Sequence, residues 1–569
     1  MAPVTARRRH HGGASSGLDR MLRSALQAHQ AGRLDEADAV YREVLARHPD
    51  QPDALHLRGL VAHQRGDGAT AVTLIGDAIR VSPTVARYHN NLGRALALLG
   101  RVAEAEASYL DALDLEPGYA EAAKNLGELS AERGRYEAAA GYFRTAAQSR
   151  PDDADVHNRL ARMLEHLNQF DAAVDAFDRA IACRPDFMVA HANLGSLQKL
   201  LGRLDEAAAC FRRAIALKPD MAELRVNLGT ALKAAGRLDE AADAYRAALA
   251  LDAGLAEAHR GLGITLAEAG RVDEAEAALL RAIELDPDAA APHHNLAELL
   301  LQRGDATAAL AACDDCLAVD PGNSRALAVK AAALDERGAR AAVRVLVDLD
   351  RLIQTTRFDA ADGFADMAAF NAALAEHVCN HPTRNFEPPN KATRLGTQTR
   401  ELLVEPKGPV AALERMIIGA VEDYLDILPA MTDHPIAAAA PGDWWLTAWA
   451  TILDSGGHQT PHIHPAAWLS GVYYVQVPSA VTADDPAHAG WIEFGRPDPG
   501  YNLAVEPDVR LIRPEPGRIV LSPSYFFHRT LPFEASDYRI SIAFDIMRED
   551  ISQGLAKFVR VAPGAGGGR

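Results

Sequence analysis

The sequence predicts a multidomain fold: a long stack of helical hairpins, followed by an α+β domain with a jelly-roll core. Two observations predict it. A small residue recurs every 34 residues through the first part of the chain, and short β-rich segments separated by turn residues dominate from about residue 444 onward. A chain of 569 residues is too long for one core. A stack of hairpins avoids that limit, because each hairpin packs only on its neighbours.

Three positions define the hairpin repeat. A small residue closes the first helix of ten successive hairpins: Ala25, Gly59, Gly93, Gly127, Ala161, Gly195, Gly229, Gly263, Ala297 and Ala331. Twelve residues later an alanine recurs from Ala37 to Ala309, with Val343 in the tenth hairpin. A proline marks the turn between hairpins at Pro49, Pro83, Pro117, Pro151, Pro185, Pro219, Pro287 and Pro321, with Ala253 as the departure. This is the tetratricopeptide pattern, and it predicts about ten repeats in an all-α superhelix over residues 18–345.

Stacked hairpins of this kind form a groove, and such a groove usually holds a protein. The residue two positions before the closing small residue is asparagine in five hairpins: Asn91, Asn125, Asn193, Asn227 and Asn295. This face of the first helix tends to line the groove, and an amide offers both a donor and an acceptor to a peptide main chain. The asparagines are therefore predicted to bind a peptide, as in the similar superhelix of the O-linked N-acetylglucosamine transferase. A mere preference for Asn-Leu-Gly in these repeats is the alternative.

Five histidines also recur once per repeat: His89, His157, His191, His259 and His293. Equivalent positions on successive hairpins are roughly 10 Å apart, given the usual helix packing distances. That separation is too large for one metal ion, so we expect these histidines to pack or to line the groove.

Charge and composition narrow the classes of partner. A formal net charge of -18 argues against nucleic acid, because phosphate binding needs a basic surface. No run of 18 apolar residues occurs, so we expect no membrane span. Five cysteines do not make a disulfide framework in a chain of this length, which favours a reducing cytoplasm. Residues 1–17 are expected to be a disordered basic tail, and residues 562–569 a flexible Gly-rich tail.

The repeat register fades after Ala331, and the boundary of the second domain is predicted near residue 350. A helix is expected over 409–428. The predicted strands are 445–453, 469–477, 490–494, 509–512, 518–522 and 538–547.

Three histidines in this second half form a candidate metal site. His462 and His464 lie in the segment Thr-Pro-His-Ile-His-Pro, and His528 follows Pro-Ser-Tyr-Phe-Phe. In extended chain an H-x-H step points both rings to one face, because side chains alternate with period two. Eleven residues after His528 come Arg539 and then Ser541, on one face of a predicted strand. Arginine is the side chain that holds a carboxylate with two parallel hydrogen bonds.

With these motifs, residues 350–548 resemble the 2-oxoglutarate-Fe(II) oxygenases of the double-stranded β-helix fold. The resemblance is carried by PHIHPAAWLSGVYYVQVP, GWIEFGRP, PEPGRIVLSPSYFFHRTLPF and RISIAFD. It implies Fe(II), 2-oxoglutarate and O2 as cofactor and cosubstrates, with His462 and His528 as iron ligands. It further implies that Arg539 holds the distal carboxylate of 2-oxoglutarate with help from Ser541, and that Tyr473 or Tyr474 contacts the cosubstrate.

The chain departs from that family at one ligand position. The usual set is two histidines and one carboxylate, and His464 stands where the carboxylate is expected. His464 is either a third ligand, or a neighbour of the metal while water or chloride completes the coordination, or an acid such as Asp454 takes the place. We favour His464 close to the metal.

Three functions remain open on the sequence. The leading one is a 2-oxoglutarate- and Fe(II)-dependent dioxygenase that hydroxylates a protein or peptide held in the repeat groove, an architecture similar to that of the aspartyl/asparaginyl β-hydroxylases. The second is a cupin-type metalloenzyme, although the glutamate expected after His464 in a cupin motif is absent. The third is a tetratricopeptide scaffold with a degenerate oxygenase domain.

Overall fold

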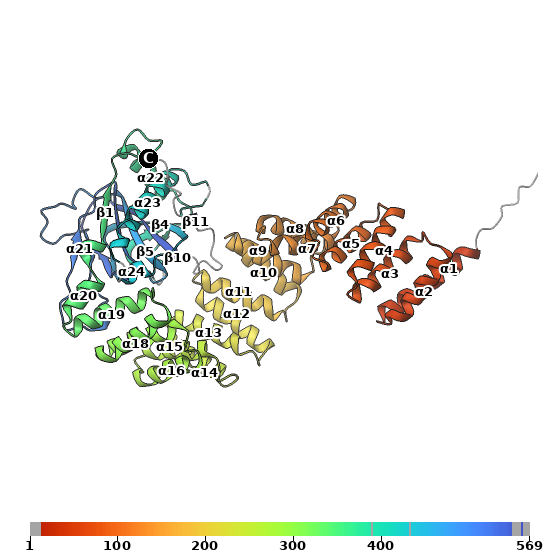
Figure 1. Ribbon diagram of the computed structural model, residues 1–569, viewed down its shortest axis with the longest axis horizontal. Coiled ribbons are helices and arrows are strands. Elements are labelled where there is room, and N and C mark those ends of the chain that lie inside the picture. Colours follow the sequence, from red (N-terminus) through yellow and green to blue (C-terminus); the bar gives the residue numbers. More distant parts are fainter. Residues whose placement is uncertain (1–12, 389–390, 405, 432–433, 549–558, 562–569) are drawn as a thin grey trace, which may run out of the picture. The chain divides into compact units, whose positions relative to one another are not determined.

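The computed structural model describes residues 13–388, 391–404, 406–431, 434–548 and 559–561. It divides into two compact units, Met1–Leu197 and Gln198–Arg569 (Figure 1). The predicted C-terminal tail and residues 1–12 of the predicted N-terminal tail lie outside the described residues. The first helix begins at Gly13, inside the segment 1–17 that was expected to be disordered.

Unit 1 consists of helical hairpins. Its helices are α1 (Gly13–Gln30), α2 (Leu34–Arg47), α3 (Pro52–Gln64), α4 (Gly68–Val81), α5 (Ala86–Leu98), α6 (Val102–Leu115), α7 (Ala120–Glu132), α8 (Tyr136–Ser149), α9 (Ala154–His166), α10 (Phe170–Cys183) and most of α11 (Met188–Leu200). Unit 2 continues the hairpins with α12 (Leu204–Leu217), α13 (Ala222–Ala234), α14 (Leu238–Leu249), α15 (Ala256–Glu268), α16 (Val272–Leu285), α17 (Ala290–Gln302), α18 (Ala306–Val319), α19 (Ser324–Glu336) and α20 (Arg340–Leu346).

The recurring small residues lie inside the first helices and do not close them as predicted: Gly127, for example, lies within α7 (Ala120–Glu132). Their role is to hold each hairpin together. A Cβ added at Gly127 would lie 2.8 Å from the ring of Phe143, so the glycine lets α7 approach the aromatic residue of α8. Gly93 and Gly229 stand in the same relation to Tyr109 and Tyr245. Each of these aromatic residues therefore packs against the first helix of its own hairpin.

The recurring histidines have a structural role. The Nε2 atom of each lies 2.8–3.2 Å from the main-chain carbonyl of the residue six positions earlier, in the turn before the helix. These carbonyls belong to Pro83, Pro151, Pro185, Ala253 and Pro287. The packing role expected for these histidines therefore takes the form of a hydrogen bond that fixes the turn between hairpins.

The rest of unit 2 is an α+β domain. Its strands are β1 (Gln354–Arg357), β2 (Asn385–Phe386), β3 (Thr393–Gln398), β4 (Trp444–His462), β5 (Ala467–Gln476), β6 (Ile492–Phe494), β7 (Arg510–Ile512), β8 (Arg518–Pro523), β9 (His528–Thr530), β10 (Arg539–Arg548) and β11 (Val559–Val561). Its helices are α21 (Leu349–Leu352), α22 (Met367–Cys379), α23 (Val410–Leu425), α24 (Pro435–Ala438) and the short 3-10 turns η1 (Leu428–Ala430) and η2 (Pro499–Tyr501).

In the described residues these strands form one antiparallel sheet with the order β1-β8-β5-β10-β4-β9-β6-β7. Strand β3 also pairs with β4, and α22 packs on β5. Strands β4, β5 and β10 lie side by side at its centre. The sheet curves as a half-barrel, so the predicted fold class is confirmed: tetratricopeptide hairpins followed by an α+β domain with the antiparallel core of a double-stranded β-helix.

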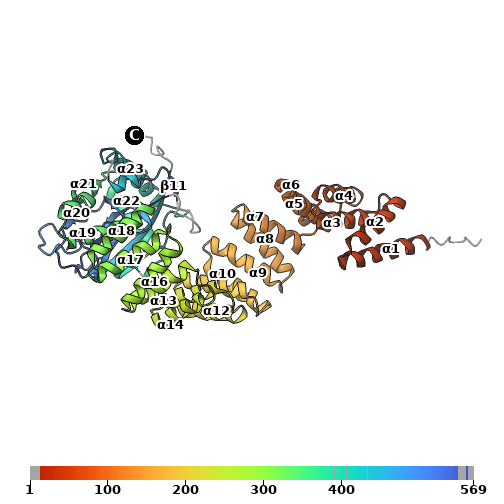
Figure 2. The same ribbon diagram turned by 60° about the horizontal axis from the view of Figure 1, so that its bottom comes forward.

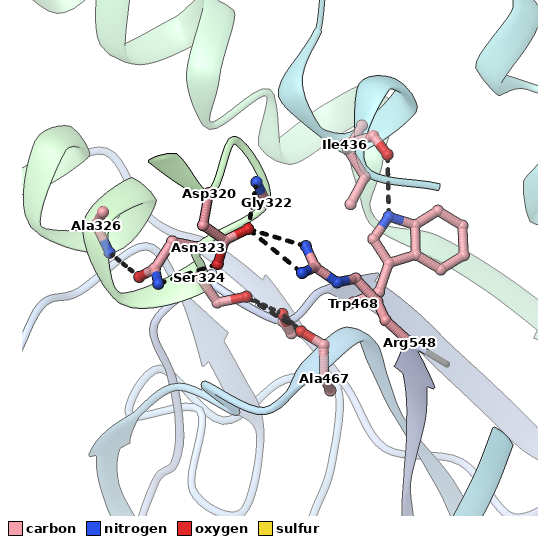
Figure 3. Close-up of polar contacts among 10 residues, drawn as sticks. Asp320, Gly322, Asn323, Ser324, Ala326, Ile436, Ala467, Trp468 and Arg548 are labelled. Atoms are coloured by element: carbon pink, nitrogen blue, oxygen red, sulfur yellow. Dashed lines mark hydrogen bonds and ion pairs between the residues drawn. The ribbon is translucent and has the colours of Figure 1, made fainter. Parts of the chain in front are cut away.

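The last hairpins pack directly on this domain (Figures 1 and 2). Ser324, at the start of α19, donates a hydrogen bond to the carbonyl of Ala467, and its hydroxyl lies 2.8 Å from that of Ser524. Arg548 of β10 contacts Asp320 at 3.3 Å (Figure 3). One hydrophobic core runs from Ala207 in the repeats to Ile546 in the sheet. The terminal repeats and the sheet therefore belong to the same folded body.

Strand β4 is much longer than the predicted 445–453, because it continues through a glycine pair and a proline to His462. The glycine pair and the proline suggested a turn, but in the structure β4 continues past them, with irregular pairing against β3 and β9. Within the described residues no helix has the length and apolar character of a membrane span.

Candidate functional site

A cavity of about 460 Å³ opens on the half-barrel. Its walls come from β4, β5 and β10, from β8 and β9, and from the chain between β4 and β5. Because side chains of a strand alternate between the two faces of the sheet, β10 presents every second residue to this cavity: Arg539, Ser541, Ala543 and Asp545.

The three predicted histidines meet in this cavity. His462 ends β4, His528 begins β9, and the two residues are paired in the strand register. His464 follows two residues after His462, and the ring centroids of the pair are 5.3 Å apart. The ligand atoms of the three imidazoles all lie within 4.8 Å of one another, close enough to hold one metal ion. The expectation that the H-x-H step places both rings on one face agrees with this geometry.

Each imidazole is held by its Nδ1 atom. Nδ1 of His462 lies 2.8 Å from the carbonyl of Thr460, and Nδ1 of His528 lies 3.0 Å from the carbonyl of Phe526. A carbonyl can only accept, so both Nδ1 atoms carry the proton and donate it. The lone pair of Nε2 is then free on both rings, as metal coordination requires.

A carboxylate holds the third imidazole. Nδ1 of His464 lies 2.6 Å from Oδ1 of Asp545, and both side chains are largely buried. A carboxylate that accepts from the outer nitrogen fixes the tautomer of a histidine and makes its other nitrogen a better metal ligand. The sequence analysis missed Asp545, although continuing the alternation from Arg539 through Ser541 leads to it. Asp454, which the sequence analysis considered as a possible carboxylate ligand of the metal, is exposed and is absent from the cavity lining.

Burial keeps two of these rings neutral. Burial, with a smaller contribution from the neighbouring imidazole of His464, lowers the pKa of His462 to about 3. Burial also lowers the pKa of His528 well below its ordinary value, with His462 adding to the effect. Neutral imidazole is the form that binds a metal, so no proton has to be displaced from these two ligands near neutral pH.

Next to the histidines lies a buried arginine. Arg539 is 2 % exposed, donates a hydrogen bond to the carbonyl of Gly490 at 2.9 Å, and lies 5.1 Å from the ring centroid of Tyr474. Burial lowers its pKa. Among the side chains that the structure describes, no carboxylate forms an ion pair with Arg539. A buried guanidinium in this state is suited to a carboxylate ligand.

The two tyrosines that were predicted as alternative cosubstrate contacts have different surroundings in the structure. Tyr474 lies under the guanidinium of Arg539 and pairs in register with Ser541. Neither tyrosine belongs to the cavity lining, and the hydroxyl of Tyr473 donates to Oδ1 of Asn371 on α22 at 2.6 Å.

Further buried polar atoms in the lining lack a partner among the described residues. They are Oγ1 of Thr451, Oγ of Ser470 and Nε of Arg539. A buried hydrogen-bonding atom without a partner is costly, so these atoms fit a polar ligand.

Two cationic residues that the sequence analysis did not single out also line the cavity. Arg325 comes from α19 of the repeats, and Lys391 from the chain before β3. No local sequence pattern could have linked Arg325 to the histidines, because the link depends on how α19 packs against the sheet.

Three of the five predicted peptide-binding asparagines take part in contacts between hairpins. Asn125 donates from Nδ2 to Asn90 at 2.8 Å, and Asn193 donates to Asn158 at 3.1 Å. Nδ2 of Asn91 lies 2.8 Å from Nε2 of His56. Asn227 is partly buried, and Oδ1 of Asn295 is buried without a partner in the described part of the chain.

Comparisons with known proteins agree with this division of the chain. Residues 447–545 match the family model described as "Putative 2OG-Fe(II) oxygenase". Tetratricopeptide repeat models match residues 22–79, 65–120, 92–152, 124–186 and 194–256, and others match 232–300 and 290–315. No curated protein matches this chain.

Solved structures similar to this chain include tetratricopeptide repeat proteins. The C-terminal part of a repeat-containing protein of Cytophaga hutchinsonii is 18% identical, with 42% of this chain and 99% of that chain covered and a TM-score of 0.37. PilF of Pseudomonas aeruginosa is 22% identical, with 36% and 94% covered and a TM-score of 0.34. MamA is 24% identical, with 28% and 94% covered and a TM-score of 0.28.

Proposed function

We propose that this chain, in which tetratricopeptide repeats precede a domain of the 2-oxoglutarate-Fe(II) oxygenase type, is a dioxygenase dependent on 2-oxoglutarate and Fe(II). Its substrate is a residue of a protein or peptide recruited by the repeats. One observation carries the proposal: three imidazoles converge with their Nδ1 atoms already engaged, beside a buried arginine that has no carboxylate partner.

The histidines fit an iron ion. His462, His464 and His528 offer three nitrogen ligands from one side, and imidazole is a good ligand for iron. His464 takes the position of the usual carboxylate as a third ligand. Asp545 then contributes its negative charge through the ring of His464 rather than by direct coordination.

The polar floor of the cavity fits the cosubstrate. Arg539 binds the distal carboxylate of 2-oxoglutarate, Ser541 on the same face of β10 assists, and the ring of Tyr474 supports the guanidinium. Thr451 and Ser470 supply further hydroxyl groups to the ligand. Tyr473 is left out of the proposed site, because its hydroxyl is engaged by Asn371.

Bound Fe(II) and 2-oxoglutarate supply the oxidative chemistry, in which one O2 is divided between the succinate formed, with release of CO2, and a new hydroxyl group on the substrate. The chain orients the reactants and keeps water away from them. Phe494 and Trp449 flank the histidines, with ring centroids 5.7 Å from those of His528 and His464 respectively.

The repeats recruit the substrate in this proposal. Tetratricopeptide repeats generally bind proteins or peptides. Asn91, Asn125, Asn193, Asn227 and Asn295 are the proposed peptide contacts. Several amides already donate once to a neighbouring hairpin, which leaves one N–H and the carbonyl oxygen for a ligand. The formal net charge of -18 disfavours nucleic acid as a partner, and five free cysteines favour a reducing, cytoplasmic location.

The proposal is tested by succinate formation from 2-oxoglutarate with Fe(II) and O2. We expect slow succinate formation by the wild-type chain even without substrate, no formation by His528→Ala, and a KM for 2-oxoglutarate raised at least roughly tenfold in Arg539→Ala. Asp454→Asn, an exposed change in the same domain, should behave as wild type. Tight binding of another metal without succinate would favour a cupin-type enzyme, and no metal binding would favour a scaffold.

A further inference from the structure

One wall residue of the cavity comes from the tetratricopeptide repeats. Arg325 is exposed in the first turn of α19, and it lines the same cavity as His464 and Arg539. Its neighbour Ser324 is buried against Ala467 and Ser524 of the oxygenase domain, so the first turn of α19 is fixed to the rim of the cavity (Figure 3).

Arg325 is positively charged at a repeat position that is usually acidic. The equivalent residues, at multiples of 34 positions, include Asp53, Glu121, Asp155, Glu223 and Glu257. An acidic residue is favoured in the first turn of a helix, because it interacts with the positive end of the helix dipole, and a cation there is disfavoured. The interaction with the helix dipole therefore does not explain why an arginine stands at position 325.

Arg325 also lacks the ion pair that nearby repeat arginines form. Arg260, Arg271, Arg281 and Arg303 on the preceding hairpins each contact a glutamate within 2.5–2.8 Å. Arg87, which occupies the equivalent position in an earlier repeat, pairs with Asp53. For Arg325 no carboxylate lies within ion-pair distance in the part of the chain that the structure describes. Glu298 of α17 is near enough for Arg325 to lower the pKa of its carboxyl, against the larger, raising effect of burial.

The cavity leaves this positive charge unbalanced. Lys391 lines the same cavity and also has no ion pair among the described residues. The lining contains one described acidic side chain, Asp545, and that carboxylate is engaged by His464. In a chain with a formal net charge of -18, the cavity thus has two cations in addition to Arg539, and no described anion in its lining is free to neutralise them.

We infer that Arg325 and Lys391 bind an acidic side chain of the substrate, placed at or beside the residue that reaches the metal. The inference rests on the proposed function and narrows its substrate class to acidic peptide segments. Arg325 is then a specificity residue supplied by the last repeat. A guanidinium with both edges open pairs with a carboxylate through two hydrogen bonds, which gives orientation as well as selectivity.

The test is a selection of random linear peptides on the full-length chain, followed by binding measurements with a synthetic peptide of the selected sequence. We expect the wild type to enrich Asp and Glu, and Arg325→Glu to bind that peptide at least roughly tenfold more weakly. Arg325→Lys should retain part of the affinity, and Lys391→Glu should weaken it as well. Misfolding of Arg325→Glu is not a concern, because other repeats have an acid at this position. Arg213→Glu, at an exposed arginine of α12 outside the cavity lining, is the matched control.

The inference is overturned if the wild type enriches no acidic residues, or if Arg325→Glu selects and binds the same peptides as the wild type. Mn(II) binding, followed separately by paramagnetic resonance on the same variants, isolates the proposed function. A chain that selects acidic peptides but binds no Mn(II) contradicts the dioxygenase and leaves the acidic-peptide site standing. A chain that binds Mn(II) but does not select acidic peptides contradicts only the acidic-peptide site.

Discussion

At the scale of single residues, Asp545 holds the unusual His464 of the proposed metal site. A three-histidine site lacks the negative charge that a carboxylate ligand would bring. The hydrogen bond from His464 to Asp545, at 2.6 Å, returns part of that charge through the imidazole ring.

Asp545→Ala is therefore expected to weaken Mn(II) binding by about 10- to 100-fold, because His464 loses its orientation and some of its basicity. Asp545→Asn should lie between this variant and the wild type, since the amide still accepts the hydrogen bond but carries no charge. Binding would be measured by paramagnetic resonance, with Asp454→Ala as the control. Wild-type affinity in Asp545→Ala would show that the carboxylate does not support the metal.

A second residue-scale prediction concerns His56 of the repeats. Burial lowers its pKa to about 4, and its Nε2 accepts a hydrogen bond from Asn91, which requires the neutral ring. Because the folded pKa lies below the unfolded value, this group stabilises the fold above about pH 6.5, and that stability is lost as the pH falls toward 4. The loss is roughly 2 kcal/mol at pH 5.

Thermal unfolding of the full chain at pH 7.5 and pH 5 checks this prediction. His56→Gln, which does not titrate and can keep a hydrogen bond to Asn91, should lose less stability between the two pH values than the wild type does. An equal loss in both proteins would assign the pH dependence to other groups.

The sequence predicted part of the candidate site residue by residue. The spacing of His462, His464 and His528 led to a shared location, and the structure brings the three rings together. Asp545 was missed because an acid at the end of an apolar strand looks like a solvent-facing residue. Arg325 was missed because its position depends on contacts between segments far apart in the chain.

At the scale of elements, the hairpins depend on close contact between the two helices of each repeat. Gly127 permits this contact, since a Cβ there would meet the fully packed ring of Phe143 at 2.8 Å. Gly141, on the outer face of α8, has no atom within 4 Å of its hypothetical Cβ.

Alanine at these two glycines should therefore have opposite effects on the free energy of unfolding. Gly141→Ala is expected to raise it by up to about 1 kcal/mol, through better helix propensity alone. Gly127→Ala is expected to lower it by about 1–3 kcal/mol, because the ring of Phe143 must move. Chemical denaturation of the full chain measures both, and a stabilising Gly127→Ala would contradict the close-contact account.

The sequence analysis placed the end of each first helix too early, because it assigned that end to a small residue that packs inside the helix. In the structure the turn between α7 and α8 comes at Gly134, whose φ is 69°. The prediction for β4 was too short, because Gly456, Gly457 and Pro461 are turn residues elsewhere. Gly456 does interrupt the regular strand, with a φ of 77°, but neighbouring strands pair with β4 on both sides of it. Single-sequence reasoning does not contain that tertiary effect.

At the scale of the whole molecule, the repeat pattern and the oxygenase motifs together gave the order of the two folds. They did not show that the later hairpins and the sheet share a core within Gln198–Arg569. That shared core fixes α19 at the rim of the cavity, so the last repeat and the sheet both contribute residues to the lining of one cavity.

The most direct measurement is an anaerobic titration of the full chain with Fe(II) and then 2-oxoglutarate, monitored by visible absorption. The account predicts a metal-to-ligand charge-transfer band in the wild type that is absent in His528→Ala and weaker in Arg539→Ala at equal 2-oxoglutarate. Tight binding of a different metal with no such band, or no metal binding at all, would contradict the assignment of a dioxygenase.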